Sequence, residues 1–270
     1  MAAWTSLWTR PYDDGSRILM KRWPMLKLAL SPFRGEIGVN YDSAFLYLTN
    51  RGAVAERWGH TPGFGRHAIG VDSLRLTNAE ASRIADVNLK SSRFVSAGPR
   101  LEWDDFVASS SEFLTDCLKT LQPVGVSVIY GDLKFYSPAQ SFDSVRDAIA
   151  SELLGGQYKH PPTNLAVFED LSVALAFKQN QTHIHTMLCP MRRHELNPHI
   201  DGEPDVEAYP DTLLFVHRRY EIRPGGSSAN ARFDLKTAEA HLESLVSSHL
   251  ASAPTDVSEY IASILQRRET

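Results

Sequence analysis

The chain has 270 residues, of which 43% are hydrophobic and 22% are charged, and its formal net charge is −4. This hydrophobic content can bury a substantial core, which excludes disorder as the dominant state, and the acidic balance argues against nucleic-acid binding through the whole surface. The cysteines, Cys117 and Cys189, are too few for a disulfide framework, so we expect a reducing compartment. Charged residues interrupt each apolar run before it reaches the length of a membrane span, so we expect a soluble, cytoplasmic protein with no membrane contact.

Residues 1–34 form an expected N-terminal arm that is rich in tryptophan and in basic residues. Aromatic and guanidinium side chains give a large contact area, so the arm could dock onto another protein, onto a second copy of the chain, or onto single-stranded nucleic acid. The predicted partner-binding residues are Trp4, Trp8, Arg17, Arg22 and Trp23. The alternative is that the arm folds back and its tryptophans fill the core of the protein itself.

The segment that follows the arm reads as strands and turns. Ile37–Tyr41 and Phe45–Thr49 have strand-like composition, and the glycine-rich stretch from His60 to Gly70 is expected to reverse the chain as a loop. Ile84–Leu89 and Arg93–Ser96 then predict a hairpin.

The clearest pattern of the chain lies between Leu101 and Ser137. Apolar residues recur at helical spacing from Trp103 to Leu121, and Gln122-Pro123 ends that pattern. Val124 to Phe135 then alternates with the period of two that is typical of a strand. The sequence therefore predicts an amphipathic helix followed by a long strand.

The second half shows a comparable order of elements. A short helix around Val145–Leu153 precedes a hairpin of Leu171–Phe177 with Thr182–Leu188, a long strand at Thr212–Ile222, and two closing helices. The sequence thus predicts an α+β fold of two similar subdomains, at residues 35–138 and 139–270, each an antiparallel sheet packed by amphipathic helices.

The central pattern also carries a resemblance. Pro99 to Phe106, the helix after it, and the strand Val126–Tyr130 resemble the central block of a sporadically distributed, uncharacterised family of bacterial proteins of similar length. In that family a Trp-x-x-Phe helix is followed by a Tyr-rich strand, and Ala231–Leu235 is similar to its last strand. The resemblance implies a bacterial, cytosolic α+β protein, and the patchy distribution of the family suggests an accessory role such as phage defence or a mobile-element function. It implies no catalytic residue.

Histidine and cysteine side chains gather in one predicted strand. His183, His185 and Cys189 fall on alternate positions, so they point to the same face and could present two imidazoles and a thiolate to a zinc ion. The spacing matches no standard zinc module, and the alternative is that the histidines lie on the solvated face of an edge hairpin.

Arginines cluster at both ends of the predicted second-half strands. The residues are Arg192, Arg193, Arg218, Arg219 and Arg223. Together they could form one anion-binding surface, which would suit phosphate and give a local site for nucleic acid. The alternative is that they are separate surface charges around a hairpin.

No nucleophile elbow, Walker loop, His-Glu-x-x-His helix or dinucleotide-binding fingerprint occurs in the sequence. The first hypothesis is therefore a non-enzymatic binding or assembly component without a cofactor that acts through protein–protein contacts. The second is a metal-dependent enzyme or nucleic-acid-processing protein that uses His183, His185, Cys189 and the nearby arginines.

Overall fold

A computed structural model describes residues 28–61, 63–80, 82–153, 170–199, 205–225 and 231–265. The strands are β1 (Ser31–Ser43), β2 (Arg66–Ile69), β3 (Ser73–Thr77), β4 (Arg83–Asn88), β5 (Ser91–Ala97), β6 (Val124–Pro138), β7 (Val173–Gln179), β8 (Thr182–Arg192) and β9 (Thr212–Ile222). The α-helices are α1 (Tyr47–Gly59), α2 (Trp103–Leu121), α3 (Phe142–Leu153), α4 (Leu235–Leu245) and α5 (Ala253–Leu265). Short turns of 3-10 helix, η2 (Arg193–His199) and η3 (Val206–Ala208), precede β9, and a π-helical turn, η4 (Val246–Leu250), extends α4.

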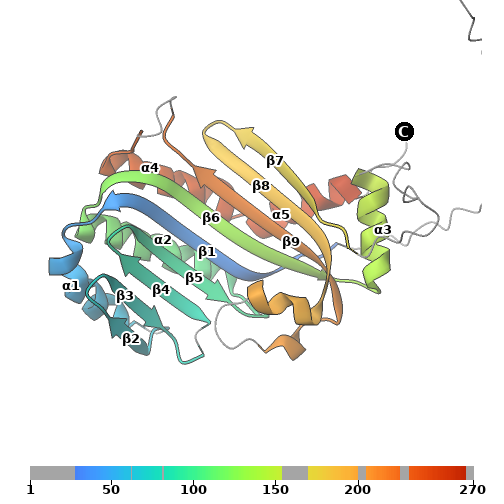
Figure 1. Ribbon diagram of the computed structural model, residues 1–270, viewed down its shortest axis with the longest axis horizontal. Coiled ribbons are helices and arrows are strands. Elements are labelled where there is room, and N and C mark those ends of the chain that lie inside the picture. The colour runs from blue at the N-terminus through green and yellow to red at the C-terminus, as the bar shows by residue number, and fades with distance from the viewer. Residues whose placement is uncertain are drawn as a thin grey trace, which may run out of the picture.

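The strands form a single 9-stranded sheet in the order β2-β3-β4-β5-β1-β6-β9-β8-β7, and neighbouring strands are antiparallel. Helices α2, α4 and α5 lie behind the sheet in Figure 1, and no α-helix of the described residues lies across the face toward the viewer. We call the latter the open face. One end of it is covered by η2 and η3, where Leu196 and Tyr209 pack over Phe215.

The main core lies between the sheet and α2. Ile37 of β1 and Phe94 of β5 are opposite each other on the helix-covered face, and both are fully buried together with Phe106 and Phe113 of α2. Gly35 makes this packing possible, because a Cβ there would lie 2.4 Å from the ring of Phe106. The predicted amphipathic stripe of α2 is therefore confirmed, and its partner is the centre of the sheet.

The α+β fold class is confirmed, and so are the predicted helix at 103–121, the hairpins β4–β5 and β7–β8, and the strand β9. The nine strands of the described residues share one sheet, and the similarity of two subdomains stays a prediction. Strand β1 begins at Ser31, inside the segment that the sequence assigned to the arm.

Two local predictions were wrong. Phe45–Thr49 is not a strand but leads into α1, where Tyr47, Val54 and Trp58 are the buried positions. Three apolar side chains at spacings of seven and four are enough for a helix that docks on one side, yet they give a weak sequence signal. The expected loop at 60–70 contains β2, an edge strand with all four residues exposed, which has no apolar alternation to detect.

Among the residues that the structure describes, no helix is long and apolar enough to cross a membrane.

The contact between β1 and α2 predicts an asymmetry between two glycines. Gly35→Ala places a methyl group against the fully buried ring of Phe106, so we expect it to lower the free energy of unfolding by about 1–3 kcal/mol. Gly52→Ala lies inside α1 with no atom within 4 Å of the new Cβ, and should raise it by about 0.5–1 kcal/mol. Urea denaturation measures both. Equal stability of the Gly35→Ala variant and the parent would contradict the packing described here.

Candidate functional site

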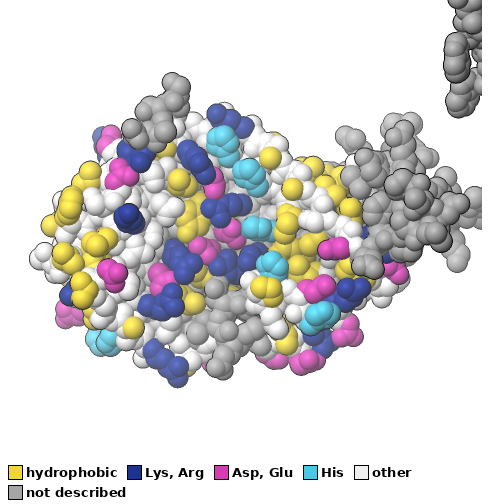
Figure 2. Space-filling model, in the orientation of Figure 1, with side chains coloured by type: hydrophobic (Ala, Val, Ile, Leu, Met, Phe, Trp, Pro, Cys, Tyr) yellow, Lys and Arg dark blue, Asp and Glu magenta, His cyan; other side chains and the backbone are white. Residues whose placement is uncertain are grey.

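The open face carries charged residues in register. Directly opposed residues of antiparallel strands point to the same face, so cross-strand pairing aligns their side chains in rows. One row runs from β3 to β7 through Arg75, Asp86, Arg93, Gly38, Tyr130, Glu221, His183 and Lys178. The row beside it runs through Glu36, Asp132, Arg219 and His185. Figure 2 shows basic, acidic and histidine side chains gathered over the middle of this face.

Ion pairs connect these side chains across the strands. At the β3 side, the Asp86 carboxylate accepts hydrogen bonds from Arg75 Nε at 2.6 Å and from Arg93 Nη2 at 2.7 Å. Arg93 Nη1 also lies 3.7 Å from Glu36 of β1. Arg93 therefore joins the outer strands to the centre of the sheet.

Glu36 and Asp132 form the centre of the network. Glu36 accepts from Arg34 Nη2 at 2.6 Å and from the hydroxyl of Tyr130 at 2.8 Å. Asp132 lies 3.5 Å from Arg34 Nη1, and its other oxygen lies 2.9 Å from His217 Nε2 and 3.3 Å from Arg219 Nη1. Each of these carboxylates is thus held by groups from more than one strand.

The network ends at β9. Glu221 accepts from Arg219 Nε at 2.7 Å and from Arg223 Nη2 at 2.7 Å. We call the whole set of connected side chains the ionic ladder: Arg34, Glu36, Arg75, Asp86, Arg93, Tyr130, Asp132, His217, Arg219, Glu221 and Arg223.

Acids and bases lie at different depths in the ionic ladder. The carboxylate side chains of Glu36, Asp86, Asp132 and Glu221 are only 10–14% exposed. The guanidinium side chains of Arg93, Arg219, Arg75 and Arg223 are 34–58% exposed. Arg34 is the exception, since it is buried between the two central carboxylates. The acids therefore form the floor of the open face, and the cations form its outer layer.

Gly38 and Tyr130 together cover the centre of the ionic ladder. A Cβ at Gly38 would lie 2.4 Å from the Tyr130 ring, so the glycine lets this ring lie across β1 and reach Glu36. The guanidinium of Arg219 then lies over the same ring, with Cζ 5.1 Å from its centroid. Burial raises the pKa of the Tyr130 hydroxyl, and the neighbouring Glu36 charge raises it further. Tyr130 therefore stays a neutral donor.

The carboxylates of the ionic ladder are held in their charged form. Burial alone would raise the pKa of Asp132, but the hydrogen bond from His217 and the charges of His217, Arg34 and Lys134 lower it to about 2. The pKa values of Asp86 and Glu221 are also lowered, because their arginine partners outweigh the same desolvation.

The predicted zinc ligands do not converge. His183 and His185 lie on the open face opposite Glu221 and Arg219, but Cys189 is buried in the apolar cluster under η2. Six residues of extended strand separate His183 from Cys189 by about 20 Å, so they share a face without sharing an ion. Burial also raises the pKa of the Cys189 thiol to about 12, which keeps it protonated. Across the described ranges, no group of three or more His, Cys, Asp and Glu side chains could hold a metal ion. Zinc binding stays a prediction, and it would need other ligands.

The predicted anion-binding arginines are divided among three places. Arg219 and Arg223 lie together in the ionic ladder. Arg218 points to the opposite, helix-covered face, where it is 8% exposed. Arg192 and Arg193 lie at the far end of β8, where Arg192 pairs with Glu195 and Arg193 with Glu207 and Asp211. They are not one surface.

The predicted partner-binding residues of the arm, Trp4, Trp8, Arg17, Arg22 and Trp23, lie outside the described residues. The central residues of the ionic ladder were missed at the sequence level. Their signal is charge on alternate positions of a strand, as in Arg34-x-Glu36 and His217-x-Arg219-x-Glu221-x-Arg223. Alternation shows that such side chains share a face, but only the strand order shows that they meet.

Comparison of the sequence with models of protein families and with curated proteins gives no match. The family resemblance of the central block therefore stays a prediction.

The depressed pKa of Asp132 predicts a specific loss of stability in acid. A carboxyl whose folded pKa lies below its unfolded value stabilises the fold fully above the unfolded pKa and loses that contribution as the pH falls through the folded one. A shift from 3.8 to about 2 corresponds to about 2 kcal/mol, lost between pH values of about 4 and 2. Asp132→Asn should be less stable than the parent at pH 7, and the difference should shrink over that window.

Urea denaturation at several pH values measures this difference. Asp143→Asn is the matched control, since this carboxylate is 72% exposed on α3 and should change stability little at any pH. A gap between Asp132→Asn and the parent that is the same at pH 7 and near pH 2 would contradict the assigned role of the carboxylate.

Proposed function

We propose that this chain is a non-enzymatic binding or assembly component that acts through protein–protein contacts, and that its open face binds an acidic segment of the partner. The observation that carries the proposal is the depth order of the ionic ladder, with carboxylates on the floor and guanidinium groups outside. The partner is another protein, and a second copy of the chain is one form of it.

Charge complementarity favours an acidic occupant. The floor carboxylates already accept hydrogen bonds from the cations around them, whereas each guanidinium has five N–H donors in a fixed fork that suits a carboxylate. The side chains of Arg93 and Arg219 are 34% and 39% exposed, so part of the positive charge of each guanidinium group faces the solvent. A chain with a net charge of −4 thus presents a locally cationic face.

The extent of the ionic ladder favours an extended segment over a point contact. Arg75 of β3 and Arg223, the residue directly after β9, mark its two ends, and the strand order places β4, β5, β1 and β6 between these strands. At about 4.8 Å between neighbouring strands, the cations spread over about 24 Å. This is the length of roughly seven extended residues.

Recognition suits these groups better than proton transfer does. General acid–base catalysis works best when a side chain has a pKa near the working pH. Asp86, Asp132 and Glu221 have lowered pKa values and Tyr130 a raised one, so each keeps a single protonation state near neutrality.

Nucleic-acid processing is the second candidate, because the same guanidinium groups also suit phosphate. Single-strand binding usually adds exposed aromatic rings on which bases stack. Tyr130, the aromatic residue at the centre of the ionic ladder, is 8% exposed and already covered by Arg219. This favours a protein partner. A metal-dependent reaction at His183 and His185 remains part of this second candidate.

The biological setting is carried by the family resemblance alone. On that ground we propose a cytoplasmic component of a bacterial accessory system, such as phage defence or a mobile-element function. The further proposal that the chain contains two similar subdomains rests on the comparable order of elements in its two halves.

Removing the outer cations at both ends of the ionic ladder tests the proposal. In Arg75→Gln with Arg223→Gln, Asp86 keeps Arg93 and Glu221 keeps Arg219, so the fold should persist. We expect the parent to bind a decaglutamate peptide with an affinity that falls as salt rises, and the double variant to bind it about tenfold or more weakly. Fluorescence anisotropy of a labelled peptide measures both.

Lys119→Gln with Lys236→Gln is the control, because it makes the same change in charge at exposed positions of α2 and α4. It should leave peptide binding within about twofold. An equal loss in the control would reduce the effect to net charge and contradict the proposal. Tighter binding of a decamer of single-stranded DNA than of the peptide would favour the second candidate.

A further inference from the structure

Arg218 is a buried cation on the helix-covered face of the sheet. It is 8% exposed, and its Nη1 donates to the hydroxyl of Thr186. Its Nε is buried and has no hydrogen-bond acceptor. Within the described part of the chain, no Asp or Glu side chain forms an ion pair with it, in contrast to the arginines of the ionic ladder.

Aromatic rings surround this guanidinium. Its Cζ lies 4.8 Å from the ring centroid of Phe177, 4.9 Å from that of Tyr260 and 5.4 Å from that of Tyr220. Cation–π contacts offset part of the cost of burying the charge, but they do not satisfy its N–H donors. A buried guanidinium with an unsatisfied donor is therefore suited to accept an anion, and the described part of the chain pairs no carboxylate with it.

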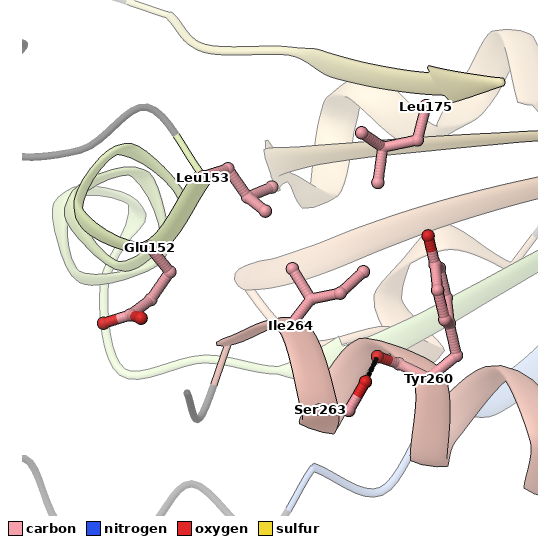
Figure 3. Close-up of a pocket in the computed structure, with 6 residues that line it drawn as sticks. All are labelled: Glu152, Leu153, Leu175, Tyr260, Ser263 and Ile264. Carbon is pink, nitrogen blue, oxygen red and sulfur yellow. Dashed lines mark hydrogen bonds between the residues drawn. The ribbon is translucent and has the colours of Figure 1, made fainter. Parts of the chain in front are cut away.

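A cavity of about 350 Å³ lies between α3, α5 and β7, and one of its lining residues is Tyr260, whose ring packs on Arg218. In Figure 3, Leu153, Leu175 and Ile264 point toward one another across it, and the hydroxyl of Tyr260 points toward Leu175. Glu152 points away from this apolar centre. The wall is thus apolar, with polar groups at its margins.

The cavity and the guanidinium share their walls. Tyr260 lines the cavity and also packs on Arg218. Leu175 of β7 is opposite Thr186 of β8, which is in turn opposite Arg218 of β9, so the three belong to one cross-strand row on one face. Since the guanidinium contacts Thr186 on β8 and Phe177 on β7, the arginine side chain extends from β9 toward the strand that bounds the cavity.

We infer that this region binds a small amphiphile, with a carboxylate head on Arg218 and an apolar body in the cavity. The apolar wall selects the body, and the buried charge selects the head. Glu152 at the margin disfavours a second anionic group at the other end of the ligand, so a monocarboxylate fits better than a dicarboxylate. This site is separate from the open face and does not depend on the function proposed above.

Three probes with the same eight-carbon chain test the inference by calorimetric titration of the full-length protein. We expect octanoate to bind at one site, 1-octanol to bind about tenfold or more weakly, and octylammonium not to bind. Arg218→Met keeps an unbranched side chain among the rings and should bind octanoate no better than octanol. Lys119→Met, on α2, should bind octanoate as the parent does.

Ile264→Trp fills the cavity without replacing Arg218, and should weaken octanoate and octanol together. If Arg218→Met does not fold, the affinity of the Ile264→Trp variant for octanoate tests the inference instead. The inference is overturned if the parent does not bind octanoate, if Arg218→Met binds octanoate as tightly as the parent does, or if filling the cavity leaves the affinity for octanoate unchanged.

Discussion

The pairing of β1 with β6 is the constraint on which both faces of the sheet depend. Its register places Ile37 and Leu133 toward the helices and Glu36 and Asp132 toward the open face. Because side chains alternate along a strand, a shift of one residue would move the charges into the core and the apolar residues to the surface. Gly35 and Gly38 fix this register further, since each accepts an aromatic ring against the backbone, Gly35 on the helix side and Gly38 on the open side.

The ionic ladder follows from that register. Its charges come from strands that are far apart in the sequence, yet every carboxylate has cations from neighbouring strands or from the same strand beside it. Partly buried ion pairs add little net stability compared with apolar packing. Their main effect here is to fix the orientation of the charged side chains. Here they hold the guanidinium groups of Arg75, Arg93, Arg219 and Arg223 in place while these side chains stay 34–58% exposed. In the proposed function, this order would lower the entropic cost of binding an anionic partner.

The sequence predicted what local patterns determine. Helix α2, strand β6 and the β7–β8 hairpin were found because apolar periodicity and turn residues are local signals. Helix α1 and the edge strand β2 were missed because they bury few side chains. The candidate site was found only at Arg219 and Arg223, since charge on alternate positions identifies a polar face but does not show which strands are neighbours. Arg218 and Arg219 were assigned to one surface although they are adjacent in a predicted strand, and alternation places them on opposite faces, as the structure shows.

The most direct measurement of the proposed role is an NMR titration that follows the Nε–Hε signals of the arginine side chains while an acidic peptide is added. If the open face is the docking surface, the signals of Arg93, Arg219 and Arg223 shift in a saturable manner, while that of Arg57, which pairs with Asp116 between α1 and α2, does not move. Saturable shifts confined to Arg57 and other groups on the helix-covered side, with the ionic ladder unchanged, would contradict it.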